Sequence, residues 1–155
     1  MRDGEAVQQT ESFLESLPLE TLDLGIKGPR LVRLCHALDH LTALHDDLTR
    51  IPPAGGGWRS PGGFAAGAQA LAGWLEATKD PEATPSPQVF KAVEEAANQI
   101  AAERTTERAR MLEEVALQRT PAGTARVGLE ELGWAEVAMQ RAWRLTESLR
   151  SASAQ

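Results

Sequence analysis

Leucines recur at heptad spacing between residues 31 and 48. The repeat consists of Leu31, Leu34, Leu38, Leu41 and Leu48, and His45 occupies the position between the last two. On an α-helix this spacing places the side chains along one side. The pattern therefore predicts a helix over residues 31–50 whose leucine side faces a packed core. Pro29 suits the start of that helix, because an N–H in the first turn has no helical partner.

Breaks rich in proline and glycine divide the rest of the chain into four further helical segments. These are a short helix over residues 4–17 and long helices over residues 64–78, 88–118 and 125–150. The breaks are the connector 18–29, the runs 51–63 and 81–87, and the turn 119–124. Thr124 is a candidate N-cap for the last helix.

Each of the three later helices has an apolar side. The helix over 64–78 has Phe64, Leu71, Trp74 and Leu75, with many Ala and Gly residues that would let a neighbour approach closely. The helix over 88–118 has Phe90, Val93, Ala97, Ile100, Met111, Leu112 and Val115. The last helix has Leu132, Ala135, Met139, Ala142, Thr146 and Leu149, widened by Ala138 and Leu145 and flanked by Trp134 and Trp143.

These elements predict an all-α protein, an antiparallel bundle of four long helices plus a short N-terminal helix. The domain division that follows is an N-terminal helix and connector over residues 1–30, the bundle over 31–150 and a frayed tail over 151–155. Composition agrees, since only 5% of the 155 residues are aromatic and strands favour aromatic and β-branched residues.

Charge and cysteine content narrow the function. The net charge of −6 argues against a nucleic-acid partner, which needs a concentrated basic surface. Residues 1–9 are polar and lack the apolar stretch of a signal peptide, and no run of about 18 apolar residues occurs in the sequence. We therefore expect no direct membrane insertion and a cytoplasmic location. Cys35 is the single cysteine and lies near the apolar side of its helix, where we expect a small buried residue rather than a nucleophile.

Two arginines interrupt the apolar stripe of the helix over 88–118. Arg104 and Arg108 fall on the side otherwise used by core residues, so both should project inward. Buried guanidinium groups need acids or an anion to meet them. Asp39 and Asp46 lie seven residues apart at the edge of the leucine stripe, beside His45. We favour an Asp–Arg network that sets helix register; the alternative is a small oxyanion site, since the Arg fork matches phosphate.

His36 and His40 are weak candidates for a metal site. They lie four residues apart and share a face with Asp47, and such a pair can chelate a divalent ion. However, that face is opposite the leucine stripe, whereas metal sites of helical bundles point inward. The sequence also has no G-x-S-x-G elbow, Walker loop or paired cysteines. We therefore expect no metal, no cofactor and no catalytic activity.

Three segments of the chain resemble a known family. They are ALDHLTALHDDL within the first long helix, ERARMLEEVALQRTPAGTA over residues 107–125, and GWAEVAMQRAWRL over residues 133–145. Together they are similar to the PhoU-like helical domain of bacterial sodium/phosphate cotransporters. The resemblance implies an all-α bundle involved in phosphate uptake or its regulation, on the cytoplasmic side of a membrane transporter, with the phosphate ion as a candidate ligand.

Two departures limit what the resemblance implies. No membrane-spanning half accompanies these segments, so we expect that this chain does not itself move phosphate. The repeated E-x-x-x-D pattern that holds metal clusters in PhoU proteins is matched only once, by Glu76 and Asp80, so metal binding is not carried over. Our leading hypothesis is a non-enzymatic regulatory or interaction domain whose partner is a phosphate transporter or a second copy. The alternatives are a metal- or small-ligand-binding bundle and a helical dimerisation module.

Overall fold

Four helices make up nearly all of the part of the chain that the structure describes. The computed structural model describes residues 28–50, 62–77 and 86–153, together with Gln9 and Ser12. The helices are α2 (Gly28–Thr49), α3 (Gly62–Ala77), α4 (Pro87–Ala116) and α5 (Ala122–Ser153), and the described residues include no strand. The all-α prediction is confirmed for these residues. Apart from Gln9 and Ser12, the predicted helix over residues 4–17 lies outside them. Residues 151–153 of the predicted frayed tail belong to α5, so that part of the prediction is wrong, and residues 154–155 lie outside the described residues.

Local signals explain where α4 begins and ends. Ser86 is its N-cap, with a hydroxyl that accepts a hydrogen bond from the Gln88 N–H at 3.3 Å, and Pro87 occupies the first helical position. At the other end Gln118 adopts a left-handed φ of 57°. This turn lets the Arg119 N–H donate to the Glu114 carbonyl at 2.8 Å, which satisfies an acceptor at the helix end.

The last helix begins earlier than the sequence predicts. The Ala125 N–H donates to the Pro121 carbonyl at 3.1 Å, so the first turn of α5 already contains Ala122 to Thr124. The prediction that Thr124 caps this helix is therefore wrong.

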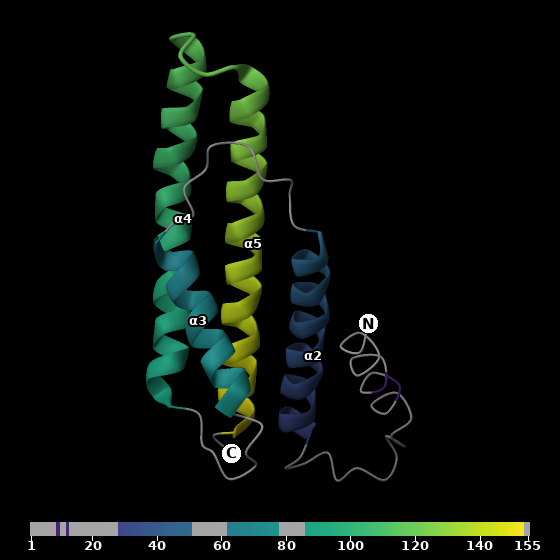
Figure 1. Ribbon diagram of the computed structural model, residues 1–155. Coiled ribbons are helices and arrows are strands. Elements are labelled where there is room, and N and C mark those ends of the chain that lie inside the picture. The colour runs from purple at the N-terminus through teal and green to yellow at the C-terminus, as the bar shows by residue number, and fades with distance from the viewer. Residues whose placement is uncertain (1–8, 10–11, 13–27, 51–61, 78–85, 154–155) are drawn as a thin grey trace.

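Helix α5 is the common neighbour of the other three helices (Figure 1). Helix α2 lies along one side of α5 and contacts no other described helix. On the other side α4 and α5 form a hairpin, and α3 crosses this hairpin at a tilt, mainly against α4. In Figure 1, α2 and α4 run upward while α3 and α5 run downward. None of the described helices is both long and apolar enough to cross a membrane.

The core is built on the apolar stripe of α5. Leu132, Ala135, Ala138, Met139, Ala142, Leu145 and Thr146 are all buried there, which confirms the predicted stripe. Helix α3 comes especially close at Gly67, where an added Cβ would lie 2.6 Å from the Ala96 Cβ and 2.8 Å from the Met139 Sδ. The prediction that small residues in this helix allow a close approach is therefore confirmed.

Helix α2 presents a different face to the bundle than the heptad predicts. Its buried residues are Ala37 and Leu44, each one position before a residue of the predicted stripe. Leu34 is 38% exposed and Leu48 is 46% exposed, while the other stripe leucines are half-buried. One residue corresponds to about 100° of rotation on a helix, so the leucine side is turned by about this angle from the contact with α5. The prediction that it faces the core holds for Leu41, which packs against the edge of the core, and is wrong for Leu34 and Leu48.

Three other burial predictions are also wrong. Leu75 and Leu112 are exposed, because they lie just outside the strips of α3 and α4 that meet a neighbour. Cys35 is exposed rather than buried, since it lies on the side of α2 away from Ala37 and Leu44. Trp74 and Phe90 do pack together, with ring centroids 6.2 Å apart.

The α4–α5 hairpin extends beyond the helices that flank it (Figure 1). Trp134 marks the limit: its ring lies 5.5 Å from that of Phe64 at the start of α3, and its indole N–H binds the end of α2. We call the part of the hairpin beyond Arg104 and Trp134 the distal hairpin. Neither α2 nor α3 extends alongside this part in Figure 1, so among the described helices its two helical segments pack against each other alone.

Candidate functional site

Arg104 and Arg108 lie at the surface of α4, where the distal hairpin begins. Both side chains are exposed, so the prediction that they project into the core is wrong. The physical reason is the length of α4. Near these residues α5 is the only neighbour among the described helices, and a helix with one neighbour has a narrower buried side than a helix inside a bundle.

Arg104 is held by a carboxylate of α5. Its guanidinium forms a hydrogen-bonded ion pair with Glu136, whose side chain is only 17% exposed. This contact joins α4 to α5 and neutralises the charge of Arg104. An Asp–Arg network was predicted here, and the partner of Arg104 is instead Glu136, on a different helix.

Arg108 is one turn further along α4 and has no acidic partner in the described part of the chain. It lines an open groove of about 370 Å³ together with Arg104 and Glu136. Thr105 contributes a hydroxyl to the same groove, and Ala101, Ala109 and Leu112 form its apolar surface. The groove therefore contains the Arg104 guanidinium, whose charge is neutralised by Glu136, and the Arg108 guanidinium, whose charge is not neutralised by a described acid. Thr105 lies beside them.

The acids predicted to meet these arginines lie elsewhere. Asp39 and Asp46 are exposed on α2, and α2 does not contact α4. His45 is half-exposed, with its Nδ1 3.8 Å from the Asp46 carboxylate. The predicted internal layer of Arg104, Arg108, Asp39, Asp46 and His45 is therefore not assembled, because α5 separates the helices that carry the two halves.

A polar layer lies between α2 and α5. Its α2 residues are outside the leucine stripe that was predicted to face the core. Arg141 forms an ion pair with Asp47 at 2.9 Å and donates a hydrogen bond to the Ala43 carbonyl at 2.6 Å. The Trp134 indole N–H donates to the Asp47 carbonyl at 2.8 Å. At the other end of α2, Arg33 donates to the Ser151 carbonyl.

These contacts have a structural role that the sequence pattern did not reveal. Two of the accepting carbonyls, those of Asp47 and Ser151, belong to the last turns of α2 and α5, where carbonyl groups lack the usual partner four residues further along the helix. The contacts also pair the start of α2 with the end of α5 and the end of α2 with an earlier part of α5, so the two helices run in opposite directions. The only available signal was the alternation of Arg33, His40 and Asp47 with Ala37 and Leu44.

His40 lies on this seam, whereas His36 is exposed. Burial lowers the pKa of His40, and the nearby cations of Arg144, His36 and Arg141 lower it further, against an opposing effect of Asp39. In the described residues no group of three or more His, Cys, Asp or Glu side chains gathers in a way that could hold a metal ion.

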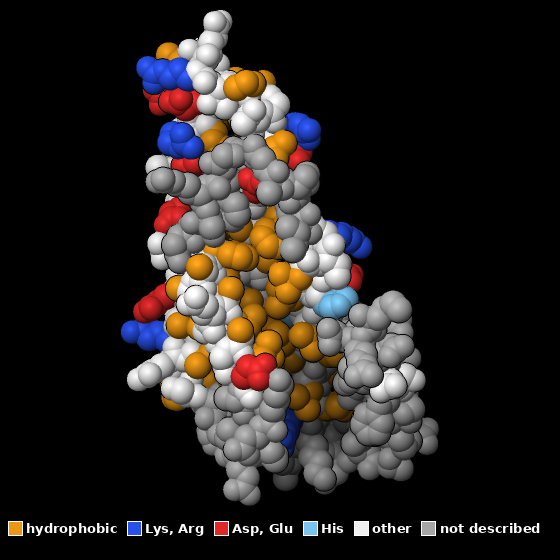
Figure 2. Space-filling view, viewed as in Figure 1, with side chains coloured by type: hydrophobic (Ala, Val, Ile, Leu, Met, Phe, Trp, Pro, Cys, Tyr) orange, Lys and Arg blue, Asp and Glu red, His pale blue; other side chains and the backbone are white. Residues whose placement is uncertain are grey.

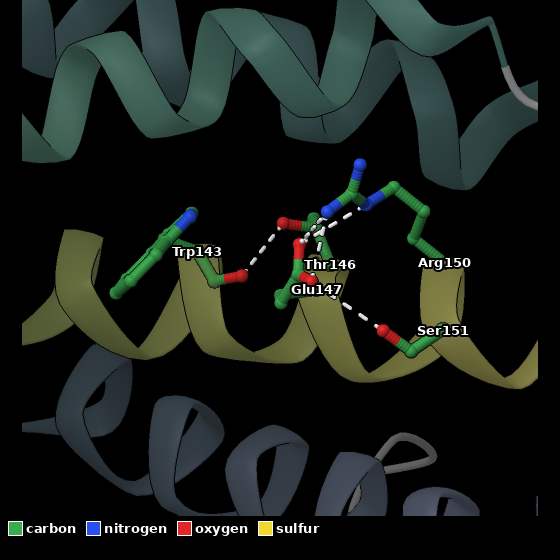
Figure 3. Close-up of polar contacts among 5 residues, drawn as sticks. All are labelled: Trp143, Thr146, Glu147, Arg150 and Ser151. Atoms are coloured by element: carbon green, nitrogen blue, oxygen red, sulfur yellow. Dashed lines mark hydrogen bonds and ion pairs between the residues drawn. The ribbon is translucent and has the colours of Figure 1, made fainter.

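A second, smaller groove of about 110 Å³ lies between the start of α4 and the end of α5. The charged groups at its α5 side are paired with each other (Figure 3). Glu147 accepts hydrogen bonds from Arg150 at 2.7 to 3.0 Å, and the Arg150 guanidinium lowers the pKa of that carboxyl. Since Lys91 is also paired, with Glu95 at 3.4 Å, this groove offers no unneutralised cation comparable to Arg108.

No protein-family model, curated protein or solved structure matches this chain.

Proposed function

We propose that this chain is a non-enzymatic regulatory domain that binds a small oxyanion, with phosphate as the ligand, in the groove lined by Arg104 and Arg108. The observation that carries this proposal is the Arg108 guanidinium, which has a place in a groove and no acidic partner among the described residues. Planar guanidinium groups bind phosphate oxygens in pairs, and charge-assisted hydrogen bonds of this kind are about twice as strong as neutral ones.

Neighbouring groups complete the proposed site. The Thr105 hydroxyl can donate to a second oxygen of the anion, and Arg104 can share its guanidinium between the anion and Glu136. Glu136 repels an anion, so the site should be weak and sensitive to salt. Weak reversible binding suits a sensor of a solute better than a carrier of it.

The connection with phosphate transport rests on the sequence resemblance. On that basis the proposed fold is the PhoU-like form of an antiparallel bundle, located in the cytoplasm. Its proposed partner is the cytoplasmic side of a membrane phosphate transporter. Phosphate in the groove would then change how the domain meets that partner.

The test is a thermal melt of the protein followed by circular dichroism, with phosphate titrated against chloride at constant ionic strength. A ligand at ten times its Kd stabilises the folded state by about 1.4 kcal/mol. For a chain of this length this corresponds to a rise in Tm of about 3–6 °C. Arg108→Met should abolish the rise without changing the fold.

The matched control is Arg126→Met. Arg126 is also an exposed arginine of the distal hairpin, but it is paired with Glu130, so the phosphate response should persist in this variant. A native protein that responds equally to phosphate and chloride would refute the proposal. A response that survives Arg108→Met would place the anion elsewhere.

A further inference from the structure

The leucine heptad of α2 forms a surface of its own. We call Leu31, Leu34, Leu38, Leu41 and Leu48 the leucine face. Helix α2 meets α5 through Ala37 and Leu44, so the leucine face points about one residue of rotation away from that contact. Leu34 and Leu48 remain 38% and 46% exposed, while Leu41 packs against the edge of the core. The face therefore has heptad spacing typical of a helix–helix seam, without a second described helix against it.

Apolar side chains also gather beside α2. Figure 2 shows hydrophobic side chains gathered between α3 and α2 in this view. A row of leucines at a and d positions on an exposed helix side normally accepts the apolar side of another helix. The leucine face is therefore suited to bind a further amphipathic helix.

The sequence contains one segment of the right length in the right place. Residues 4–17 have Val7, Phe13, Leu14 and Leu17 at helical spacing, and as a helix they would be about 20 Å long. The leucine face is about 25 Å long from Leu31 to Leu48. The ten residues 18–27 join the two and can span up to roughly 33 Å, enough for the segment to turn back along α2.

The charges of the two segments are complementary. Residues 1–27 contain six acids, Asp3, Glu5, Glu11, Glu15, Glu20 and Asp23, against two bases, Arg2 and Lys27. The first half of α2 has the opposite sign, with Arg30, Arg33 and His36 before its first acid at Asp39. An acidic helix returning from the start of α2 would lie beside these basic residues first.

We propose that residues 4–17 of this chain bind the leucine face of α2 as an amphipathic helix. A second copy of the chain is the competing occupant. Stable interfaces between proteins bury about 1,200–2,000 Å², far more than one row of half-buried leucines supplies. A tethered segment needs much less area, because its effective concentration is in the millimolar range. The segment covers the face, and any partner helix that uses this face must first displace it.

Cys35 makes a direct test feasible. It is the single cysteine, it is exposed, and it follows directly after Leu34, a member of the leucine face. A nitroxide attached to Cys35 in ¹⁵N-labelled full-length protein should cause loss of amide signal intensity for Phe13 and Leu14. Reduction of the nitroxide should restore both signals. A mixture of spin-labelled unenriched protein with unlabelled ¹⁵N protein should show no such loss, because the contact is within one chain.

Two variants show whether the apolar side of the segment makes the contact. Leu14→Glu should remove the signal loss while the circular dichroism of the bundle is retained. The control Gln9→Glu adds the same charge at an exposed position and should keep it. Signal loss that appears only in the mixed sample would assign the face to a second copy and overturn the proposal. Absence of signal loss in both samples would also overturn it.

Discussion

The contact of α3 with the α4–α5 hairpin can be tested at Gly67, where helix propensity and packing oppose each other. In an ordinary helix interior, replacing Gly by Ala stabilises the fold by roughly 0.5–1 kcal/mol. At Gly67 the new Cβ would lie 2.6 Å from the Ala96 Cβ. The Met139 Sδ and Cε, at 2.8 and 2.9 Å, belong to a flexible side chain and can move, but Ala96 moves only with its helix.

We therefore expect Gly67→Ala to destabilise the protein. Overpacking a close contact costs about 1–3 kcal/mol, and a mid-range cost of about 2 kcal/mol less the propensity gain leaves a net loss of about 1–1.5 kcal/mol. For a chain of this size 1 kcal/mol changes Tm by about 2–4 °C, so the variant should melt about 2–6 °C lower. Urea unfolding should show the same order of stability with an unchanged m-value.

Gly73 in the same helix is the matched control. A Cβ there would have no atom within 4 Å, so Gly73→Ala should stabilise the protein by the propensity gain alone, roughly 0.5–1 kcal/mol. The double variant Gly67→Ala/Ala96→Gly should be more stable than the sum of the two single effects, because it removes the closest contact. If Gly67→Ala stabilised the protein as much as Gly73→Ala, the close approach of α3 to Ala96 would be refuted.

Two further predictions concern the seam between α2 and α5. Arg141→Met should lower the free energy of unfolding by about 1–3 kcal/mol, because the mostly buried Asp47 carboxylate and the Ala43 carbonyl both lose a partner; an unchanged urea midpoint would contradict the described contacts. The pKa of His40 should lie below 6.5 in an NMR titration and rise in Arg144→Gln, which removes one of the cations that lower it. Neutral His40 should contribute stability that is complete above pH 6.5 and is lost as the pH falls through the lower folded-state pKa, and a pKa above 6.5 would reverse this dependence.

Periodicity predicted the helices and the buried side of α5, because α5 has neighbours on several sides and nearly every apolar residue of its stripe meets one of them. It failed for α2 for a physical reason. Periodicity identifies the most apolar side of a helix, and the side that meets a neighbour can lie next to it. Here the seam includes Arg33, His40 and Asp47, whose polar ends find partners on α5 or lie at its edge.

The candidate site was predicted only in part. Arg104 and Arg108 were identified as unusual, and the groove that contains both was not, because it forms where α4 extends beyond α3. Their predicted partners Asp39 and Asp46 required contact between α2 and α4, which depends on the order of helices around the bundle. The partner of Arg104 is Glu136, and no spacing rule within one helix can identify a partner on another.

Because the helices differ in length, the local stability of the α4–α5 hairpin should decrease from its base toward its turn. Helices α4 and α5 contain 30 and 32 residues, whereas α2 and α3 contain 22 and 16. Near Ala96 and Met139, amide protons can exchange with solvent only after several helices separate. Toward the turn at Gln118, α4 and α5 are the only described helices that must separate, so hydrogen exchange should accelerate steadily toward that end while the base of the hairpin stays closed.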